Sequence, residues 1–325
     1  MTQNQTLEKY SPEWYAIHGE AEGTPNPLLA KTKGWPIRLS KSAFMTYLGC
    51  PRKYWWTRVA DLYGPSTHHM VHGTAVHTAL ENVYGNWKPE SNMAAIAEVN
   101  WEDGEPHEPH AKWDEDQQDR YTGAVDALVQ LEQGRLQRWG EEHFTPVEFE
   151  QKHVLRHEHE SHVFNLVGMI DGVLRHPDGG LVIAELKTGK ATKNKLSKTR
   201  KELCFYRHML AELWGEEAVY FYYLFPECEN YDLYVELDGK KNTEVWLGDL
   251  QGMAVLEKVS TRSVNAMHKS LDKAMSGILN DMWDMKWNDY FCTQWCDFNM
   301  ACESEMLGVE PDPTVSYTGV SEGWA

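Results

Sequence analysis

A turn-forming segment between two apolar runs constrains the fold of this chain more than any other feature. Residues 176–180 read HPDGG, and the runs LVGMIDGVLR before them and LVIAELK after them are typical of β-strands. Between residues 147 and 186 the apolar side chains recur with a period of two, as at Val163 and Val167. The pattern predicts an antiparallel hairpin at the centre of the fold.

Two acidic residues and one lysine are expected to meet on this hairpin. Alternate side chains of a strand share a face, so Glu185 and Lys187 project to one side while Leu186 points into the core. Asp171 lies fourteen positions before Glu185 and can face both residues across the hairpin. Charges that alternate on an exposed strand for solubility are the competing interpretation, but the apolar flanks make unpaired charges costly here.

Two converging carboxylates suit a hard divalent cation, Mg²⁺ or Mn²⁺, because both ions prefer oxygen ligands. Such an ion acidifies a bound water molecule and neutralises charge on a phosphoryl group. Lys187 would position the attacking water and offset charge in the transition state. The hairpin therefore predicts a site for metal-assisted hydrolysis.

Four ordered motifs resemble those of the RecB-like nucleases, a group that includes the CRISPR-associated RecB-like exonucleases. They are HGTAVHTALE at 72–81, GMIDG at 168–172, ELKTGK at 185–190 and ELCFY at 202–206. The resemblance covers residues 40–303 and implies a PD-(D/E)xK nuclease. It implies catalytic roles for Asp171, Glu185, Lys187, Glu202 and Tyr206, and metal ligation by His77, Asp171, Glu185 and the Leu186 backbone carbonyl.

Two of these roles depend on local context. A single histidine on a helix is usually a packed or surface residue, but the position of His77 in its motif favours a metal ligand. Glu202 stands where the family often has glutamine, four residues before Tyr206, and the two share a helical face. The resemblance implies that Tyr206 lines the substrate channel and that Glu202 approaches a metal-bound water or pairs with a basic side chain.

Four cysteines form a one-plus-three pattern. Cys292, Cys296 and Cys302 lie within eleven residues, and Cys50 lies more than 200 residues earlier. This spacing suits an iron–sulfur cluster or tetrahedral zinc, and spacing alone leaves both open, as it does unligated thiols. The pattern resembles the 4Fe-4S site of several RecB-like nucleases, although here three residues rather than two separate the first pair of the trio. The resemblance implies a structural cluster that joins the two chain ends.

A formal net charge of −18 argues against a protein that coats nucleic acid through its overall charge. Contact with phosphate must then be local. Residues 187–201 contain seven basic and no acidic residues, and this run could follow a DNA backbone into the site, with a solvated loop as the alternative. The candidate DNA-binding residues are Lys190, Lys193, Lys195, Lys198, Arg200 and Lys201.

The remaining pattern divides the chain into helices, strands and irregular segments. Residues 1–38 are expected to form an N-terminal arm, 39–303 the nuclease domain with an insertion at 88–118, and 304–325 a C-terminal tail. Helices are expected at 40–49, at 51–55, at 70–84, at 116–139, at 197–213 and, as one or two helices, at 249–287. A buried strand is expected at 218–225. Cys204 and Cys228 are expected to be core thiols.

Together these patterns predict an α/β, restriction-endonuclease-like fold with a central mixed sheet flanked by helices and a helical iron–sulfur region built from both chain ends. The expected function is a metal-dependent deoxyribonuclease, by resemblance a single-strand exonuclease in DNA repair, recombination or processing. The alternatives are a non-catalytic DNA-end or partner-binding iron–sulfur accessory protein and a nuclease with zinc in place of the cluster. Expected partners are DNA that is single-stranded or has free ends, and a helicase or CRISPR integrase; the polar opening and the lack of a spanning segment predict a cytoplasmic protein without membrane contact.

Overall fold

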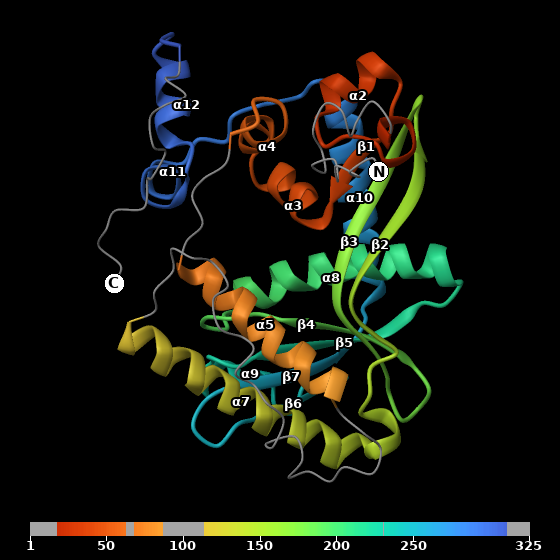
Figure 1. Cartoon of the computed structure of the whole chain (residues 1–325), viewed down its shortest axis with the longest axis vertical. Coiled ribbons are helices and arrows are strands. Elements are labelled where there is room, and N and C mark those ends of the chain that lie inside the picture. Colours follow the sequence, from red (N-terminus) through yellow and green to blue (C-terminus); the bar gives the residue numbers. More distant parts are fainter. Residues whose placement is uncertain (1–17, 63–67, 87–113, 230, 311–325) are drawn as a thin grey trace, which may run out of the picture. The chain divides into compact units, whose positions relative to one another are not determined.

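The computed structural model describes residues 18–62, 68–86, 114–229 and 231–310, which divide into two units (Figure 1). Unit 1 draws on segments from both chain ends, within 1–65 and 268–325, together with 154–167. Unit 2 comprises segments within 66–153 and 168–267. All the residues predicted to form the metal site fall in unit 2, and the four cysteines of the one-plus-three pattern fall in unit 1.

The predicted hairpin is confirmed. It consists of β3 (His162–Arg175) and β4 (Leu181–Leu186), which pair antiparallel from Gly172 opposite Ala184 to Arg175 opposite Leu181. Gly179 adopts a φ of +87°, a left-handed conformation that glycine tolerates without a steric penalty. Strand β2 (Glu148–His159) pairs with β3 as well, which confirms the strand pattern between residues 147 and 186.

Three further strand pairings complete the sheet of unit 2. Helix α8 (Lys193–Trp214) leads from β4 to its parallel neighbour β5 (Ala218–Phe225), whose bounds match the predicted strand. Strand β7 (Met253–Lys258) pairs antiparallel with β5 and with β6 (Thr243–Leu247), and α9 (Tyr231–Leu237) precedes β6. The strand order β1-β3-β4-β5-β7-β6, with β2 beside β3, gives a seven-stranded mixed sheet flanked by helices, and the predicted fold class is confirmed.

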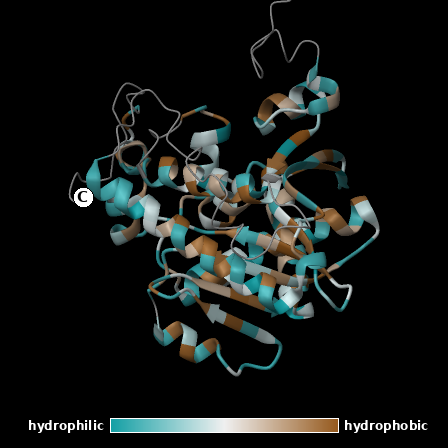
Figure 2. Ribbon diagram, turned by 60° about the horizontal axis from the view of Figure 1, so that its bottom comes forward, coloured by the Kyte–Doolittle hydropathy of each residue, from teal (hydrophilic) through white to brown (hydrophobic). Residues whose placement is uncertain are grey.

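Helices cover the two faces of the sheet in unit 2. In Figure 1, α5 (His68–Asn86) and α7 (Glu115–Trp139) lie on one face of β4, β5 and β7, and α8 lies on the other. Val76 and Leu128 pack with Val182 and Tyr222 in one buried cluster. Figure 2 shows hydrophobic residues on the strands of the sheet and a mixture of hydrophilic and hydrophobic residues along the helices. The predicted helices at 70–84, 116–139 and 197–213 are confirmed, each within a few residues at its ends.

A fully buried ion pair fixes α7 in this core. Arg135 donates to Glu132 at 2.7 Å and to the carbonyl of Phe144 at 2.8 Å, and both charged side chains are 0% exposed. Tyr84 of α5 and Tyr222 of β5 donate to the same carboxylate at 3.2 and 3.0 Å. The carboxylate thus joins α7 to α5 and to β5 inside the core.

Replacing Glu132 with alanine is therefore expected to lower the free energy of unfolding by about 3–5 kcal/mol, because it leaves a buried guanidinium without its counter-charge. Urea denaturation followed by circular dichroism measures the loss. Glu244→Ala, on the outer strand β6, serves as a surface control. An equal effect of both substitutions would show that the buried pair adds nothing specific.

In unit 1, α3 (Lys41–Gly49) and α4 (Pro51–Arg58) confirm the two predicted N-terminal helices. The Ser40 side chain caps α3 by accepting from the Ala43 amide at 3.2 Å. Strand β1 (Ile37–Ser40) pairs parallel with β3, starting from Ile37 opposite Phe164. Helices α11 (Asp289–Trp295) and α12 (Asn299–Met306) carry the three C-terminal cysteines or flank them.

Two expectations about local structure were wrong. Residues 27–33 form α2 (Pro27–Lys33), capped by Asn26 and with Ala30 buried, where an arm without regular structure was expected; seven residues are too few to show helical periodicity. Residues 249–258 contain β7 rather than a helix, because the apolar run MAVL is buried on both faces and so does not alternate. Helix α10 (Thr261–Leu279) begins only after that strand.

The segments at 1–17, at 87–113 and at 311–325 lie outside the described residues, and with them most of the expected insertion and tail. Residues 115–118 of the expected insertion belong to α7, and residues 304–306 of the tail belong to α12. Among the described helices, none combines the length and apolar character needed to cross a membrane.

Candidate active site

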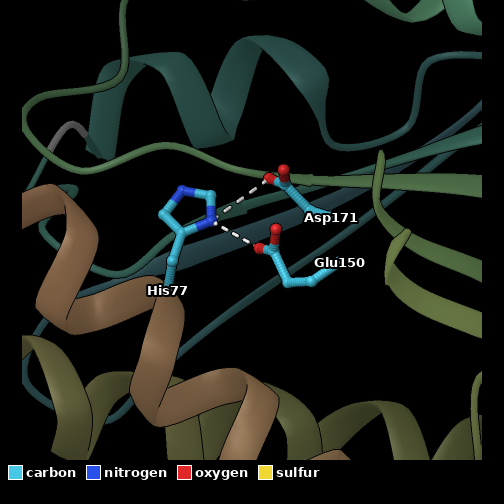
Figure 3. A group of neighbouring side chains, drawn as sticks. All are labelled: His77, Glu150 and Asp171. Atoms are coloured by element: carbon cyan, nitrogen blue, oxygen red, sulfur yellow. Dashed lines mark hydrogen bonds and ion pairs between the residues drawn. The ribbon is translucent and has the colours of Figure 1, made fainter. Parts of the chain in front are cut away.

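Three side chains from three elements of unit 2 converge on one point. His77 of α5, Glu150 of β2 and Asp171 of β3 each offer a ligand atom, and these atoms lie within 4.8 Å of one another. The Nδ1 atom of His77 is 3.1 Å from Glu150 Oε1 and 3.7 Å from Asp171 Oδ2, as Figure 3 shows. One imidazole nitrogen and two carboxylate oxygens suit a divalent cation such as Mn²⁺ or Mg²⁺.

The backbone of β2 is adapted to bring Glu150 into this group. Glu150 has a φ of +46°, a left-handed conformation that is rare for a residue with a side chain and typical of a bulge in a strand. A regular strand would send residues 148 and 150 to the same face. Glu148 instead pairs with His153 at 2.8 Å, and Glu150 turns toward His77.

The charge around His77 favours a cation. Burial alone would lower the pKa of His77, but the carboxylates of Asp171 and Glu150 outweigh burial and raise the pKa to about 9, and Glu185 adds to the shift. At neutral pH the imidazole therefore carries a proton when no ion is bound. The same negative field that holds this proton would attract a divalent cation in its place.

Asp171 also ties the two strands of the hairpin together at the site. Its Oδ2 atom accepts a hydrogen bond from the Leu186 amide at 2.8 Å, which fixes the carboxylate beside the end of β4. Leu186, whose amide makes this hydrogen bond, is also the residue whose carbonyl is predicted to be a backbone ligand. Its ligation of a metal ion stays a prediction.

Lys187 lies between two carboxylates next to this group. Its Nζ atom is 2.5 Å from Glu185 Oε1 and 3.1 Å from Glu202 Oε2 of α8. The Glu185 side chain is only 1% exposed, so its charge is compensated chiefly inside the protein. The structure thus brings Glu185, Lys187 and Glu202 together, and of the two roles that the resemblance implies for Glu202 it shows the pairing with a basic side chain.

Tyr206 is buried beneath β3. Its hydroxyl donates to the carbonyl of Met169, and a side chain added at Gly168 would come within 2.7 Å of the ring. Burial, together with Glu185 and Asp171, raises the pKa of Tyr206 far above its usual value. Its hydroxyl therefore stays protonated and braces the strand that carries Asp171, while its role in a substrate channel stays a prediction.

The basic side chains of residues 187–201 fall into two groups, those that contact other protein groups and those that are exposed. Arg200 donates to Glu257 at 2.5 and 2.7 Å, Lys193 pairs with Glu236 at 2.5 Å, and Lys195 donates to the carbonyl of Gly189 at 3.2 Å. These contacts reduce what the three residues can offer to a phosphate. Of the other candidates, Lys190 and Lys198 are exposed and Lys201 is half-buried.

The four cysteines gather in unit 1. Cys292, Cys296 and Cys302 are buried and Cys50 is half-buried, at the junction of α3 and α4. Burial raises the pKa of Cys302 to about 11; the Trp56 hydrogen bond opposes this shift, and Cys296 and Cys50 add to it. The donors fit a metal centre, since a cation would supply the charge that buried thiols need in order to ionise.

Two hydrogen bonds to sulfur support this fit. Trp56 Nε1 donates to Cys302 Sγ at 3.4 Å, and the Asn288 amide donates to Cys292 Sγ at 3.3 Å. Hydrogen bonds to sulfur are among the features that tune thiolate-bound iron–sulfur clusters. Cys204 and Cys228 lie in unit 2 and are buried, which confirms them as core thiols.

Glu150 is the one residue of the group His77, Glu150 and Asp171 that no motif points to. It occurs in the stretch EFEQ, where two glutamates alternate with other residues as they do on many solvated strands. The signal that distinguishes it, the positive φ, is a property of the backbone. His77, Asp171, Glu185, Lys187 and Glu202 were all found from the motifs.

Glu150→Gln is expected to weaken Mn²⁺ binding by roughly 10–100-fold, whether the carboxylate binds the ion directly or orients His77. Isothermal titration calorimetry of the purified protein with Mn²⁺ measures the affinity. Glu148→Gln, on the same strand but paired with His153, is the matched control and should leave the affinity within about twofold of the unsubstituted value. Equal affinities for both variants would remove Glu150 from the site.

The chain was compared with known structures, curated sequences and protein families. The crystal structure of SSO0001 is similar over 82% of this chain and 85% of that chain, with 12% sequence identity and a TM-score of 0.36. A comparison with curated protein sequences found no match. The family model of the PD-(D/E)XK nuclease superfamily matches residues 38–303, a span that includes His77, Glu150 and Asp171 and the four cysteines of the one-plus-three pattern. Because that match extends over most of its length, the chain belongs to the PD-(D/E)XK nuclease superfamily.

Proposed function

We propose that this protein is a Mg²⁺- or Mn²⁺-dependent deoxyribonuclease that hydrolyses phosphodiester bonds from the ends of single-stranded DNA. Membership of the superfamily supports a metal-dependent nuclease in general. The observation that carries the proposal is the convergence of His77, Glu150 and Asp171. Lys187 directly follows the strand that bears Glu185, and its ammonium contacts that carboxylate.

The bound ion would supply an acidified water molecule and a counter-charge for the phosphoryl oxygens. His77, Asp171 and Glu185 would hold it, with Glu150 and the Leu186 carbonyl as further ligands. Lys187 has its ammonium between Glu185 and Glu202, and there it would orient the attacking water and offset charge on the phosphate. Glu202 in turn limits the directions in which that ammonium can point.

The finer parts of the proposal concern the substrate and its delivery. The preference for single strands with free ends, and a helicase or CRISPR integrase as partner, follow the resemblance of the four motifs to RecB-like nucleases. DNA repair, recombination or processing is the setting that this resemblance suggests. Lys190 and Lys198 are exposed close behind Lys187 and offer local positive charge in a chain of net charge −18.

The proposal includes a structural 4Fe-4S cluster bound by Cys50, Cys292, Cys296 and Cys302. Four gathered thiols and two hydrogen bonds to sulfur support a metal centre. The one-plus-three pattern favours iron–sulfur over zinc, which more often uses two close pairs. We further propose that the nuclease domain, with the cluster, extends over residues 39–303.

A titration of Mg²⁺ or Mn²⁺ against end-labelled single-stranded DNA tests the activity. Cleavage that requires the ion, stops with EDTA and releases mononucleotides or short products from one end is the expected result. A circular single strand serves as the control for the need for a free end. Binding to DNA ends without cleavage at any ion concentration would instead identify a non-catalytic accessory protein, and cutting of the circle would identify an endonuclease.

A further inference from the structure

We propose that Glu227 and Lys195 are positioning residues that hold the loop after Lys187 and so place its ammonium for the reaction. The inference rests on the proposed role of Lys187. Neither residue touches Glu185 or the group His77, Glu150 and Asp171 in any described contact. Both would act through the backbone of Thr188 and Gly189.

Lys187 needs such support because it stands just beyond the end of a strand. On its N-terminal side the sheet fixes it, since β4 ends at Leu186 and the Lys187 amide donates to the carbonyl of Leu224 at 2.9 Å. On its C-terminal side the chain leaves the sheet, and Gly189 turns it with a φ of +76°. The direction of the Lys187 side chain therefore depends on how Thr188 and Gly189 are held.

Glu227 holds the amide side of this loop. Its carboxylate accepts a hydrogen bond from the Gly189 amide. The same carboxylate accepts from Arg120 of α7, Nε at 2.5 Å and Nη2 at 3.2 Å, and lies 3.2 Å from His72 Nε2 of α5. The Glu227 side chain is 11% exposed, so these contacts are largely shielded from water. One carboxylate thus anchors the loop to two helices at once.

The ionised state of Glu227 is consistent with this role. Burial alone would raise the pKa of Glu227, but His72, Arg120 and the Gly189 amide together lower it to about 2. The carboxylate is therefore charged at every pH at which the protein is expected to work. A charged acceptor makes a stronger hydrogen bond to the Gly189 amide than a neutral group would.

Lys195 holds the carbonyl side of the same loop. Its Nζ atom donates to the carbonyl of Thr188 and, at 3.2 Å, to that of Gly189. Burial lowers the pKa of Lys195, and the nearby charge of Lys187 adds to the shift. The ammonium is thus turned toward the loop, and its contacts point to positioning rather than to the phosphate binding expected from the basic run.

The anchor also relates the loop to the helix of the metal site. His72 stands five residues before His77 on α5, and a Cβ placed on Gly73 of that helix would lie 3.5 Å from the Thr188 hydroxyl. Glu227 therefore bonds both to the helix that carries the metal-ligand histidine and to the loop that follows the lysine. A misplacement of about 1 Å between such groups can reduce turnover about 100-fold.

Steady-state kinetics of the full-length protein with saturating Mn²⁺ and single-stranded DNA test the role of Glu227. Glu227→Ala is expected to lower kcat about 100-fold, with KM and Mn²⁺ affinity within about threefold of the unsubstituted protein. Glu227→Gln, which can still accept from the Gly189 amide, should recover part of the loss. Amide hydrogen exchange of the peptide spanning 187–190 should become faster in Glu227→Ala.

The matched control is Glu257→Gln. Glu257 is 13% exposed and pairs with Arg200 in two hydrogen bonds, so it resembles Glu227 in burial and in its partner, but none of its described hydrogen bonds reaches the loop. The control should lose similar thermal stability while keeping kcat. If Glu227→Ala and Glu257→Gln have equal kcat, or if exchange at 187–190 is unchanged in Glu227→Ala, the positioning role of Glu227 is overturned.

Lys195→Met separates loop positioning from DNA binding. Positioning predicts a lower kcat with an unchanged dependence of KM on salt. Phosphate binding predicts a higher KM and a salt slope reduced by about one, and that result would overturn the assignment of Lys195. Two other results would contradict the proposed function instead: an unsubstituted protein that does not cleave DNA, or an unchanged kcat in Lys187→Met. In both cases, amide hydrogen exchange at 187–190 still shows whether Glu227 and Lys195 hold the loop.

Discussion

Lys187→Met is expected to lower kcat at saturating Mn²⁺ by about 100- to 1,000-fold. The substitution keeps the length of the apolar stem and removes only the ammonium that lies between Glu185 and Glu202. Because it also removes positive charge from beside the metal site, Mn²⁺ should bind as tightly as before or more tightly. Single-turnover cleavage of end-labelled DNA and calorimetry with Mn²⁺ measure the two quantities.

Lys240→Met is the control for the loss of one lysine, because Lys240 is exposed and pairs only with Glu236 among its described ionic contacts. It should leave both quantities unchanged. Circular dichroism shows whether the Lys187 variant remains folded, since its loss leaves two neighbouring carboxylates less compensated. A folded Lys187→Met protein with full activity would remove this lysine from the mechanism.

Cys50→Ser is expected to abolish the brown colour and the absorption near 400 nm of anaerobically purified protein, together with most of its bound iron. Cys50 is 242 residues before Cys292, so a centre bound to both closes a very long loop. If the bound centre acts like a covalent cross-link, losing it should lower the free energy of unfolding of unit 1 by about 5 kcal/mol. Iron analysis and denaturation monitored by tryptophan fluorescence measure these effects.

Cys204→Ala is the matched control, because Cys204 is a buried thiol of unit 2 and should leave the spectrum unchanged. Colourless protein that contains one zinc ion per chain would favour the zinc alternative. Full iron content in Cys50→Ser would show that the three C-terminal cysteines bind the centre without it.

The parts of the fold that could be predicted are those in which local pattern and tertiary environment agree. The hairpin has a turn sequence and two apolar strands, so its position followed from the sequence, as did the closeness of Glu185 and Lys187 at the end of its second strand. Strand β5 was recognisable because AVYFYYLF is rich in aromatic and β-branched residues. The metal-site histidine, by contrast, depended on the resemblance to RecB-like motifs.

The parts that could not be predicted depend on contacts distant in sequence. Strand β7 is buried on both faces by its neighbours, so it lacks the alternation that marks a strand. Glu150 joins the site because it adopts a left-handed backbone conformation itself, which a glutamate in the sequence does not signal. Lys195 belongs by sequence to a basic run, yet its ammonium is bonded to backbone carbonyls of a neighbouring loop.

The discontinuous make-up of unit 1 has a consequence for biosynthesis. A ribosome completes every segment of unit 2 before it reaches the C-terminal cysteines, so unit 2 can fold while the chain is still emerging. Helices α3 and α4, with Cys50 at their junction, leave the ribosome well before α11 and α12, so Cys50 is made long before the three later cysteines of the same unit. Any nascent chain that terminates early would therefore expose Cys50 and its apolar surroundings, a state suited to recognition by chaperones and proteases.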